Sequence, residues 1–237
     1  MNNAMILAGG VGKRMGASVP KQFIEVNGKP IIVYTLEIFE NHPLIDAVEV
    51  VCVEGYQNLI NEYIEKYNLK KVKYITTGGE NCQDSIRNGL YNLEGFCKKD
   101  DNIIIHMAAN PLVEEDIITD CINVTNKYGN AASAEPVLSY TFCVDDEVGS
   151  SSYIEREKIK LLNMPLGYKY GEVLDLYKRA YKEHKGVDGN VYADTLYVDY
   201  GKKVYFCKGS RTNIKITTQE DIELFKAYLS IKGEKHD

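Results

Sequence analysis

Short apolar runs that favour β-structure alternate with helical patterns along the first half of the chain, and this alternation limits the possible folds more than any other feature. The expected strands cover residues 4–7, 47–53, 72–76 and 103–106, and the expected helices cover residues 31–39, 59–67, 84–93 and 113–128. Such alternation is typical of βαβ units with right-handed crossovers. Two of the strands are almost continuously apolar, as strands covered by helices on both faces are. We therefore predict an α/β fold with a mostly parallel central sheet flanked by helices.

The second half of the chain continues this pattern with one interruption. Helices are expected at 168–184 and 191–200, a strand at 204–207, and a last helix near Thr217, which has capping-box spacing to Glu220. Residues 137–162 instead combine serines, charges and β-prone residues. We expect this stretch to project from the domain, either as a β-arm that serves in dimerisation or as a long surface loop. Because no repeat or linker is present, residues 1–237 are expected to form a single domain.

Charge and composition exclude several classes of protein. The chain has 34 acidic and 28 basic residues, a formal net charge of -6, which disfavours a general polyanion binder, so no nucleic-acid partner is expected. A small phosphorylated ligand stays compatible with this charge. No run of 18 apolar residues and no basic leader occurs, so we expect a cytoplasmic protein without a membrane segment. The six cysteines are spaced singly, which favours reduced thiols over a zinc site.

The segment LAGGVGKRMGASVPKQ, residues 7–22, carries the strongest chemical signal. Its glycines follow an expected strand and are interleaved with Lys13, Arg14 and Lys21. Glycine lets backbone N–H groups approach an anion closely, and the cations add charge-assisted contacts to phosphate oxygens. The spacing matches neither the P-loop nor the dinucleotide fingerprint. The segment thus predicts a phosphate loop of another kind, the alternative being a glycine-rich turn with solvated lysines.

Further motifs extend this signal into a family resemblance. LAGGVGKRMG, followed by PKQF and NGKPII, resembles the opening of nucleotidyltransferases. The resemblance continues through Gly78, Gly79 and QDSIRNGL, through His106 with Ala108 and Pro111, and into NIKITTQED at residues 213–221. It covers nearly the whole chain in the order of the family. The NIKITT segment narrows it to the cytidylyltransferases that act on methylerythritol phosphate or ribitol 5-phosphate, which implies a Rossmann-like nucleotidyltransferase domain.

The resemblance implies that a phosphorylated polyol attacks the α-phosphorus of CTP and expels pyrophosphate, a reaction that depends on positioning and on cations. It assigns triphosphate binding to Arg14 and Lys21, and stabilisation of charge at the α-phosphate to Lys215. The implied nucleotide-binding residues are Ala8, Gly9, Gly10, Gly12, Gly79, Ser85 and Ala108. The implied acceptor-binding residues are Asn110, Tyr140, Met164 and Arg156, the last acting across a homodimer. Taken singly, Lys215 could be a surface lysine, Ser85 a helix cap and Arg156 a loop charge.

The chain departs from the family at positions where chemistry is expected. The family pattern His-Asp-Ala-x-Arg-Pro reads HMAANP, so Met107 replaces an aspartate and Asn110 an arginine, and a second family aspartate is Thr212. Mg²⁺, or Mn²⁺, is the cofactor that the family implies, but neither replacement offers the carboxylate oxygens that it prefers. Asp84, Asp188 and Asp194 are candidates to supply a carboxylate instead.

Other departures lie around the acceptor. Cys82 stands where an arginine is usual, Tyr140 where a threonine is usual, and residues 163–166 read NMPL instead of QTPQ. His106, a lone histidine after an apolar strand, is expected to be a hydrogen-bonded structural residue. The sequence thus predicts CTP-dependent cytidylyl transfer to a small phosphorylated polyol, with an altered acceptor. The alternatives are a nucleotide-binding protein without catalysis and a sugar-1-phosphate nucleotidyltransferase that uses another base.

Overall fold

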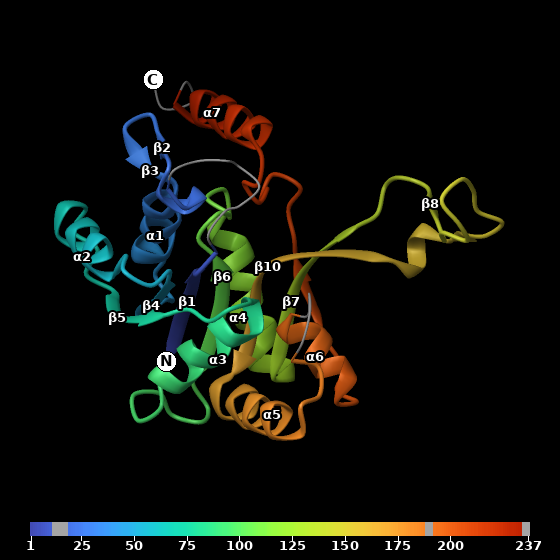
Figure 1. Cartoon of the computed structure of the whole chain (residues 1–237), viewed down its shortest axis with the longest axis horizontal. Helices are drawn as coiled ribbons and strands as arrows, with labels where there is room; N and C mark the ends of the chain where they lie inside the picture. Colours follow the sequence, from blue (N-terminus) through green and yellow to red (C-terminus); the bar gives the residue numbers. More distant parts are fainter. Residues whose placement is uncertain (11–18, 188–191, 234–237) are drawn as a thin grey trace.

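A seven-stranded sheet runs through the middle of the molecule (Figure 1). The computed structural model describes residues 1–10, 19–187 and 192–233. In chain order the strands are β1 (Asn2–Ala8), β4 (Ala47–Cys52), β5 (Val72–Thr77), β6 (Asn102–Met107), β7 (Asn130–Pro136), β10 (Lys160–Lys169) and β11 (Phe206–Lys208). Their order across the sheet is β11-β7-β10-β6-β1-β4-β5. Among them β10 alone runs antiparallel to its neighbours, which confirms the predicted mostly parallel sheet.

Helices cover both faces of this sheet. They are α1 (Ile31–Asn41), α2 (Gln57–Lys66), α3 (Cys82–Asn92), α4 (Glu115–Tyr128), α5 (Tyr170–Glu183), α6 (Ala193–Asp199) and α7 (Gln219–Gly233). Alternate strand residues point to opposite faces, so Ile6 packs with α1, α2 and α4, whereas Met5 packs with α3, α5 and α6. Burial on both faces explains the continuous apolar runs of the central strands. Within the described ranges, no helix is long and apolar enough to span a bilayer.

Helix α7 belongs to a third, smaller core together with the short pair β2 (Glu25–Val26) and β3 (Lys29–Pro30). Phe225 packs edge-on against Tyr34, with ring centroids 5.1 Å apart. The cap of α7 differs from the prediction by one residue. Thr218, not Thr217, accepts from the backbone N–H of Asp221, and the Asp221 carboxylate accepts from the N–H of Thr218 in return. Asp221, rather than Glu220, therefore closes the capping box.

Residues 137–162 project from the domain, as predicted (Figure 1). The projection ends in a two-stranded antiparallel pair, β8 (Thr141–Phe142) and β9 (Tyr153–Ile154), followed by the 3₁₀ turn η3 (Arg156–Lys158). Its last residues, 160–162, already belong to β10.

Two strands of the central sheet, β7 and β10, were not predicted. β7 is built from NAASAEP, whose small residues carry no β-signal, and β10 contains Pro165. Both become strands because their partners supply the hydrogen bonds, β10 lying between β6 and β7. The helix expected from 168 begins at Tyr170, since β10 extends to Lys169.

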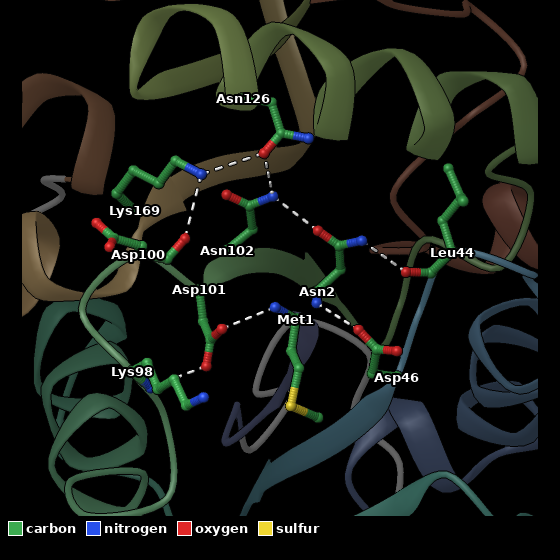
Figure 2. A network of polar contacts seen from close by, with 10 residues as sticks. All are labelled: Met1, Asn2, Leu44, Asp46, Lys98, Asp100, Asp101, Asn102, Asn126 and Lys169. Carbon is green, nitrogen blue, oxygen red and sulfur yellow. Dashed lines mark hydrogen bonds and ion pairs between the residues drawn. The ribbon is translucent and has the colours of Figure 1, made fainter.

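At the amino ends of the central strands, polar groups bind one another (Figure 2). The Met1 amino group lies 2.7 Å from the Asp101 carboxylate, which also accepts from the Lys98 N–H. The Asn102 side chain donates to the side-chain oxygens of both Asn2 and Asn126, at 2.7 and 2.8 Å. These contacts fix the end of the sheet that lies opposite the cavities described below.

Candidate active site

Two adjoining cavities lie at the carboxyl ends of the parallel strands. The chain extends the sheet from β1 outward to β5 and then crosses back to β6, so the strand order reverses beside β1, where open α/β sheets bind ligands. The first cavity has a volume of about 550 Å³ and is formed by the loops after β1, β5 and β6 and by residues 215–217. It brings together eight of the predicted site residues: Ala8, Gly9, Gly10, Lys21, Gly79, Ser85, Ala108 and Lys215.

Close backbone packing shapes one wall of the first cavity. A Cβ on Gly79 would lie 2.1 Å from the Cβ of Asp84, and one on Gly9 would lie 3.0 Å from the Ser85 hydroxyl. That hydroxyl accepts from the Gly79 N–H and donates to the Asn81 carbonyl, at 3.0 and 2.9 Å. Asn81 is the cap of α3, so Ser85 is a wall residue of the cavity rather than the helix cap.

Gln22, whose role the sequence did not reveal, holds the loop after β1. Its buried side chain lies in the turn η2 (Lys21–Phe23) and donates to the carbonyls of Ala8 and Gly10, at 2.6 and 3.0 Å. Gln22 belongs to the motif PKQF, but that motif indicated a role only for its lysine, Lys21. Gln22 fixes the direction of the glycine backbone beside the cavity.

Lys21 and Lys215, far apart in sequence, line the same cavity. The Lys21 ammonium donates to the carbonyl of Ile216 at 2.6 Å, directly beside Lys215. The Ile216 N–H in turn donates to the Ala109 carbonyl in the loop after β6, at 2.8 Å. The segment that carries Lys215 is thus held against both loops, and the predicted meeting of these two cations is observed.

Two asparagines hold the same segment from the other side. The Asn213 carbonyl accepts from the side chains of Asn110 and Asn163, at 3.2 and 2.9 Å. The Asn213 side chain donates to the Met164 carbonyl at 2.6 Å. Asn110 and Asn163 stand where the family has an arginine and a glutamine, so the altered residues here position the segment that contains Lys215.

The second cavity, of about 350 Å³, adjoins the first and shares Met107 and Lys215 with it. Its remaining wall is mostly apolar but includes Asn110, Asn163, Tyr192, Asp194 and Thr195, and the predicted Met164. Because Lys215 belongs to both walls, it lies at the junction of the cavities, where it can contact ligands in both.

Burial is the main cause that raises the pKa of the Cys82 thiol, while Lys215 lowers it and Asp194 raises it.

His106 has the structural role that the sequence indicated. It is fully buried, its Nε2 lies 2.9 Å from the Asn110 carbonyl, and it is not a wall residue of either cavity. Burial lowers its pKa to about 4, so the imidazole is neutral at physiological pH. It supports the loop that carries Asn110 rather than exchanging protons with a ligand.

Two predicted residues, Tyr140 and Arg156, are not brought to the two cavities. Tyr140 is 91% exposed on the projection, and Arg156, in η3 of the same projection, lies 3.0 Å from the Glu157 carboxylate. Neither lines a cavity of this chain. Arg14 and Gly12 lie outside the described residues.

The described residues do not bring together a cluster of carboxylates for magnesium. Met107 presents a thioether at the junction of the cavities, and Thr212 contacts Ser210 and Glu114 instead of lining either one. The Asp84 carboxylate is held by Tyr181 and Arg87. Across the described ranges, no group of three or more His, Cys, Asp and Glu side chains could hold a metal ion. Asp188 lies outside those ranges.

Comparison with known proteins decides the family. The profile of the family "IspD: 2-C-methyl-D-erythritol 4-phosphate cytidylyltransferase" matches residues 3–231. The chain belongs to this family. It is 43% identical to a ribitol-5-phosphate cytidylyltransferase of Lacticaseibacillus paracasei, over 98% of this chain and 99% of that protein. It is 38% identical to a 2-C-methyl-D-erythritol 4-phosphate cytidylyltransferase of Clostridium botulinum, over 94% and 95%.

Solved structures agree with this membership of the cytidylyltransferase family. The chain superposes on the 4-diphosphocytidyl-2C-methyl-D-erythritol synthase of Anaerococcus prevotii with a TM-score of 0.82 and 23% identity, over 97% of this chain and 96% of the other. The cytidylyltransferase of Francisella tularensis gives 0.78 and 26%, over 95% and 98%. The predicted fold and the enzyme class, a nucleotidyltransferase, are confirmed, and the comparisons favour an enzyme over a nucleotide-binding protein without catalysis.

Proposed function

We propose that this cytidylyltransferase transfers CMP from CTP to ribitol 5-phosphate and releases pyrophosphate. The observation that carries the proposal is the position of Lys215 at the junction of two cavities, with Lys21 beside it. The first cavity, with its glycine backbone and cations, suits the nucleotide. The second suits the acceptor, so that the α-phosphorus and the acceptor phosphate meet at Lys215.

The chemistry needs no protein base. An oxygen of the acceptor phosphate, already largely ionised at neutral pH, attacks the α-phosphorus and forms the new P–O–P linkage. The bond between the α-phosphorus and the bridging oxygen breaks, and that oxygen leaves with its electron pair on pyrophosphate. Lys215 and Lys21 offset the negative charge that gathers on the phosphate oxygens. This fits a buried, neutral His106 that is not a wall residue of either cavity.

We propose that magnesium enters as part of the substrate, the Mg–CTP complex. Magnesium keeps much of its coordination shell as water and phosphate oxygens, so the nucleotide can carry it without the two family aspartates. The replacement of those aspartates by Met107 and Thr212 supports this.

We propose ribitol 5-phosphate rather than methylerythritol phosphate as the acceptor because of the sequence identities to the relatives. The protein of Lacticaseibacillus paracasei named for ribitol 5-phosphate is 43% identical, against 38% for the protein of Clostridium botulinum named for methylerythritol phosphate.

The six cysteines are free thiols, which suits the reducing cytoplasm where we place the reaction.

The experiment is a pyrophosphate-release assay with CTP, UTP, GTP and ATP against ribitol 5-phosphate, methylerythritol 4-phosphate and glycerol 3-phosphate. We expect turnover with CTP and ribitol 5-phosphate, with kcat/KM at least tenfold above the other pairs. Binding of CTP without turnover on any acceptor would instead favour a protein that binds nucleotide but has lost catalysis.

We also propose that the protein is a homodimer joined through the 137–162 projection. Apolar and aromatic side chains are exposed there, among them Tyr140, Phe142, Val144, Val148 and Tyr153, at 60–96%. In a dimer, Arg156 of one chain would then reach the acceptor of the other.

Subunit mixing tests this arrangement. Arg156→Ala and Lys215→Ala chains, each nearly inactive alone, should regain turnover when mixed and refolded together, because one site of each mixed dimer keeps both cations. A monomer by sedimentation, or no recovery on mixing, would count against it.

A further inference from the structure

Asp194 is a buried carboxylate in the wall of the second cavity. Its residue is 7% exposed, and its Oδ1 has no hydrogen-bond partner among the residues that the structure describes. Burying a carboxylate oxygen without a donor costs free energy that folding must offset elsewhere. A buried polar atom without a hydrogen-bond partner needs an explanation, and a ligand that donates a hydrogen bond to Oδ1 would provide one.

The helix that carries Asp194 does not account for the unpaired oxygen. Asp194 lies in the first turn of α6, where the backbone N–H groups of Thr195 and of Asp194 itself act to lower the pKa of its carboxyl group. Burial still raises the pKa of this carboxyl group despite those N–H groups. The start of the helix therefore leaves the buried Oδ1 without a described donor.

A second acceptor without a donor lies in the same wall. The Asn110 side chain uses its amide N–H groups toward Asn213 and Asn163, which fixes the orientation of the amide, and its Oδ1 has no described donor. Two residues in the wall of the second cavity thus each have a buried oxygen without a described donor, while Lys215 supplies positive charge where the cavity meets the first. A ligand with a phosphate at one end and several O–H donors along its length complements both features.

We propose that Asp194 determines acceptor specificity by accepting hydrogen bonds from hydroxyl groups of the polyol chain while its phosphate lies at Lys215. This inference rests on the proposed function, which it deepens by naming the part of the acceptor that is read. A carboxylate in this wall repels acceptors that carry a second acidic group, such as phosphorylated sugar acids. The enzyme should therefore discriminate by hydroxyl donors rather than by length alone.

A purely structural role would involve the neighbouring tyrosines. Asp194 raises the pKa of the fully buried Tyr168, after burial itself, and the Tyr168 hydroxyl also has no described partner. If Asp194 served only that hydroxyl, Tyr168→Phe would reproduce the Asp194 phenotype. Under the proposal Tyr168→Phe leaves acceptor binding unchanged.

The test is calorimetric binding of ribitol 5-phosphate to wild type, Asp194→Ala and Asp194→Asn, which needs no turnover, together with steady-state kinetics. A hydrogen bond to a charged group predicts about 10- to 100-fold weaker acceptor binding in Asp194→Ala, with the KM for CTP unchanged. Asp194→Asn, which can keep the contacts at the start of α6, guards against misfolding of the alanine variant. Asp199→Asn, an exposed aspartate of the same helix, is the matched control and should behave as wild type.

Deoxyribitol 5-phosphates, each lacking one hydroxyl group, complete a double-mutant cycle between Asp194 and the acceptor. For at least one of them, wild type should lose as much affinity as Asp194→Ala loses on ribitol 5-phosphate, and the variant should lose nothing more. Additive losses on every analogue, an altered KM for CTP, or no binding of ribitol 5-phosphate to wild type would overturn the role of Asp194. Binding without turnover would reject the proposed function alone.

Discussion

The first cavity is built from main chain and cations, whereas the second is built from side-chain amides, a buried carboxylate and apolar groups. Gly9, Gly79 and Gln22 fix backbone in the first, and any change there alters the loop itself. In the second, side chains such as Met164 and Leu166 line the wall, and Asn110 and Asn163 hold the main chain of Asn213. The glycine motif of the family is intact around the first cavity, although Cys82 and Met107 in its wall depart from the family pattern, as Asn110 and Met164 do in the second.

The largest effect is expected at the residue that belongs to both cavities. Lys215→Ala should lower kcat by about 10³-fold, since removal of one group that stabilises transition-state charge costs about 10²–10³. Lys21→Ala should lose a similar factor and also weaken CTP binding, because Lys21 holds the Ile216 carbonyl as well. Pyrophosphate release measures both, with Lys203→Ala, an exposed lysine away from the cavities, as control. Near-normal rates in both variants would contradict the roles assigned to Lys215 and Lys21.

The main-chain wall of the first cavity should not tolerate a Cβ added at Gly79. Gly79→Ala places a Cβ against Asp84, so we expect a loss of about 2 kcal/mol of stability and a Tm lower by about 5 °C. Gly10→Ala is the matched control, because its Cβ meets no described residue within 4 Å. Thermal unfolding distinguishes the two, and equal Tm values would show that the loop after β5 is not constrained as described.

The amide contacts of the second cavity should matter less. Asn163→Ala removes one donor to the Asn213 carbonyl and should lower kcat about tenfold by loosening the segment that carries Lys215. Asn110→Ala should act similarly, and the double variant should lose less than the product, because both side chains share one acceptor. Asn126→Ala, at the opposite end of the sheet, should leave kcat unchanged. Fully multiplicative losses would mean that the two asparagines act separately.

The smallest effect on turnover is expected at His106. Its folded pKa of about 4 lies below the ordinary value near 6.5, so its contribution to stability is complete above pH 6.5 and is lost as pH falls toward 4. Wild type should lose about 2 kcal/mol at pH 5 from this group, and His106→Gln should lack that loss in urea unfolding. The pH–rate profile between 6 and 8 should keep its shape in the variant, since a histidine-like ionisation that disappears would make His106 a proton carrier.

Sequence patterns revealed most of the fold and most of the first cavity. The strands around β1 are apolar on both faces, and glycines with cations follow the first of them, so local pattern was enough. β7 and β10 could not be found this way, because small residues and Pro165 become strand only when partners on both sides supply the ladder. The role of Gln22 escaped for the same reason, since its acceptors lie 12 and 14 residues earlier.

The amino-acid sequence alone determined the α/β class and the set of glycines and lysines that line the first cavity. Those properties are encoded in spacings of a few residues, where steric and hydrogen-bonding preferences act directly. Only the tertiary structure decided that Lys21 contacts the main chain beside Lys215, that Asn110 and Asn163 share one carbonyl, and that Asp194 lies in a cavity wall with an Oδ1 that has no donor among the described residues. Contacts across 50 to 195 residues depend on how strands order in the sheet, and no local spacing carries that information.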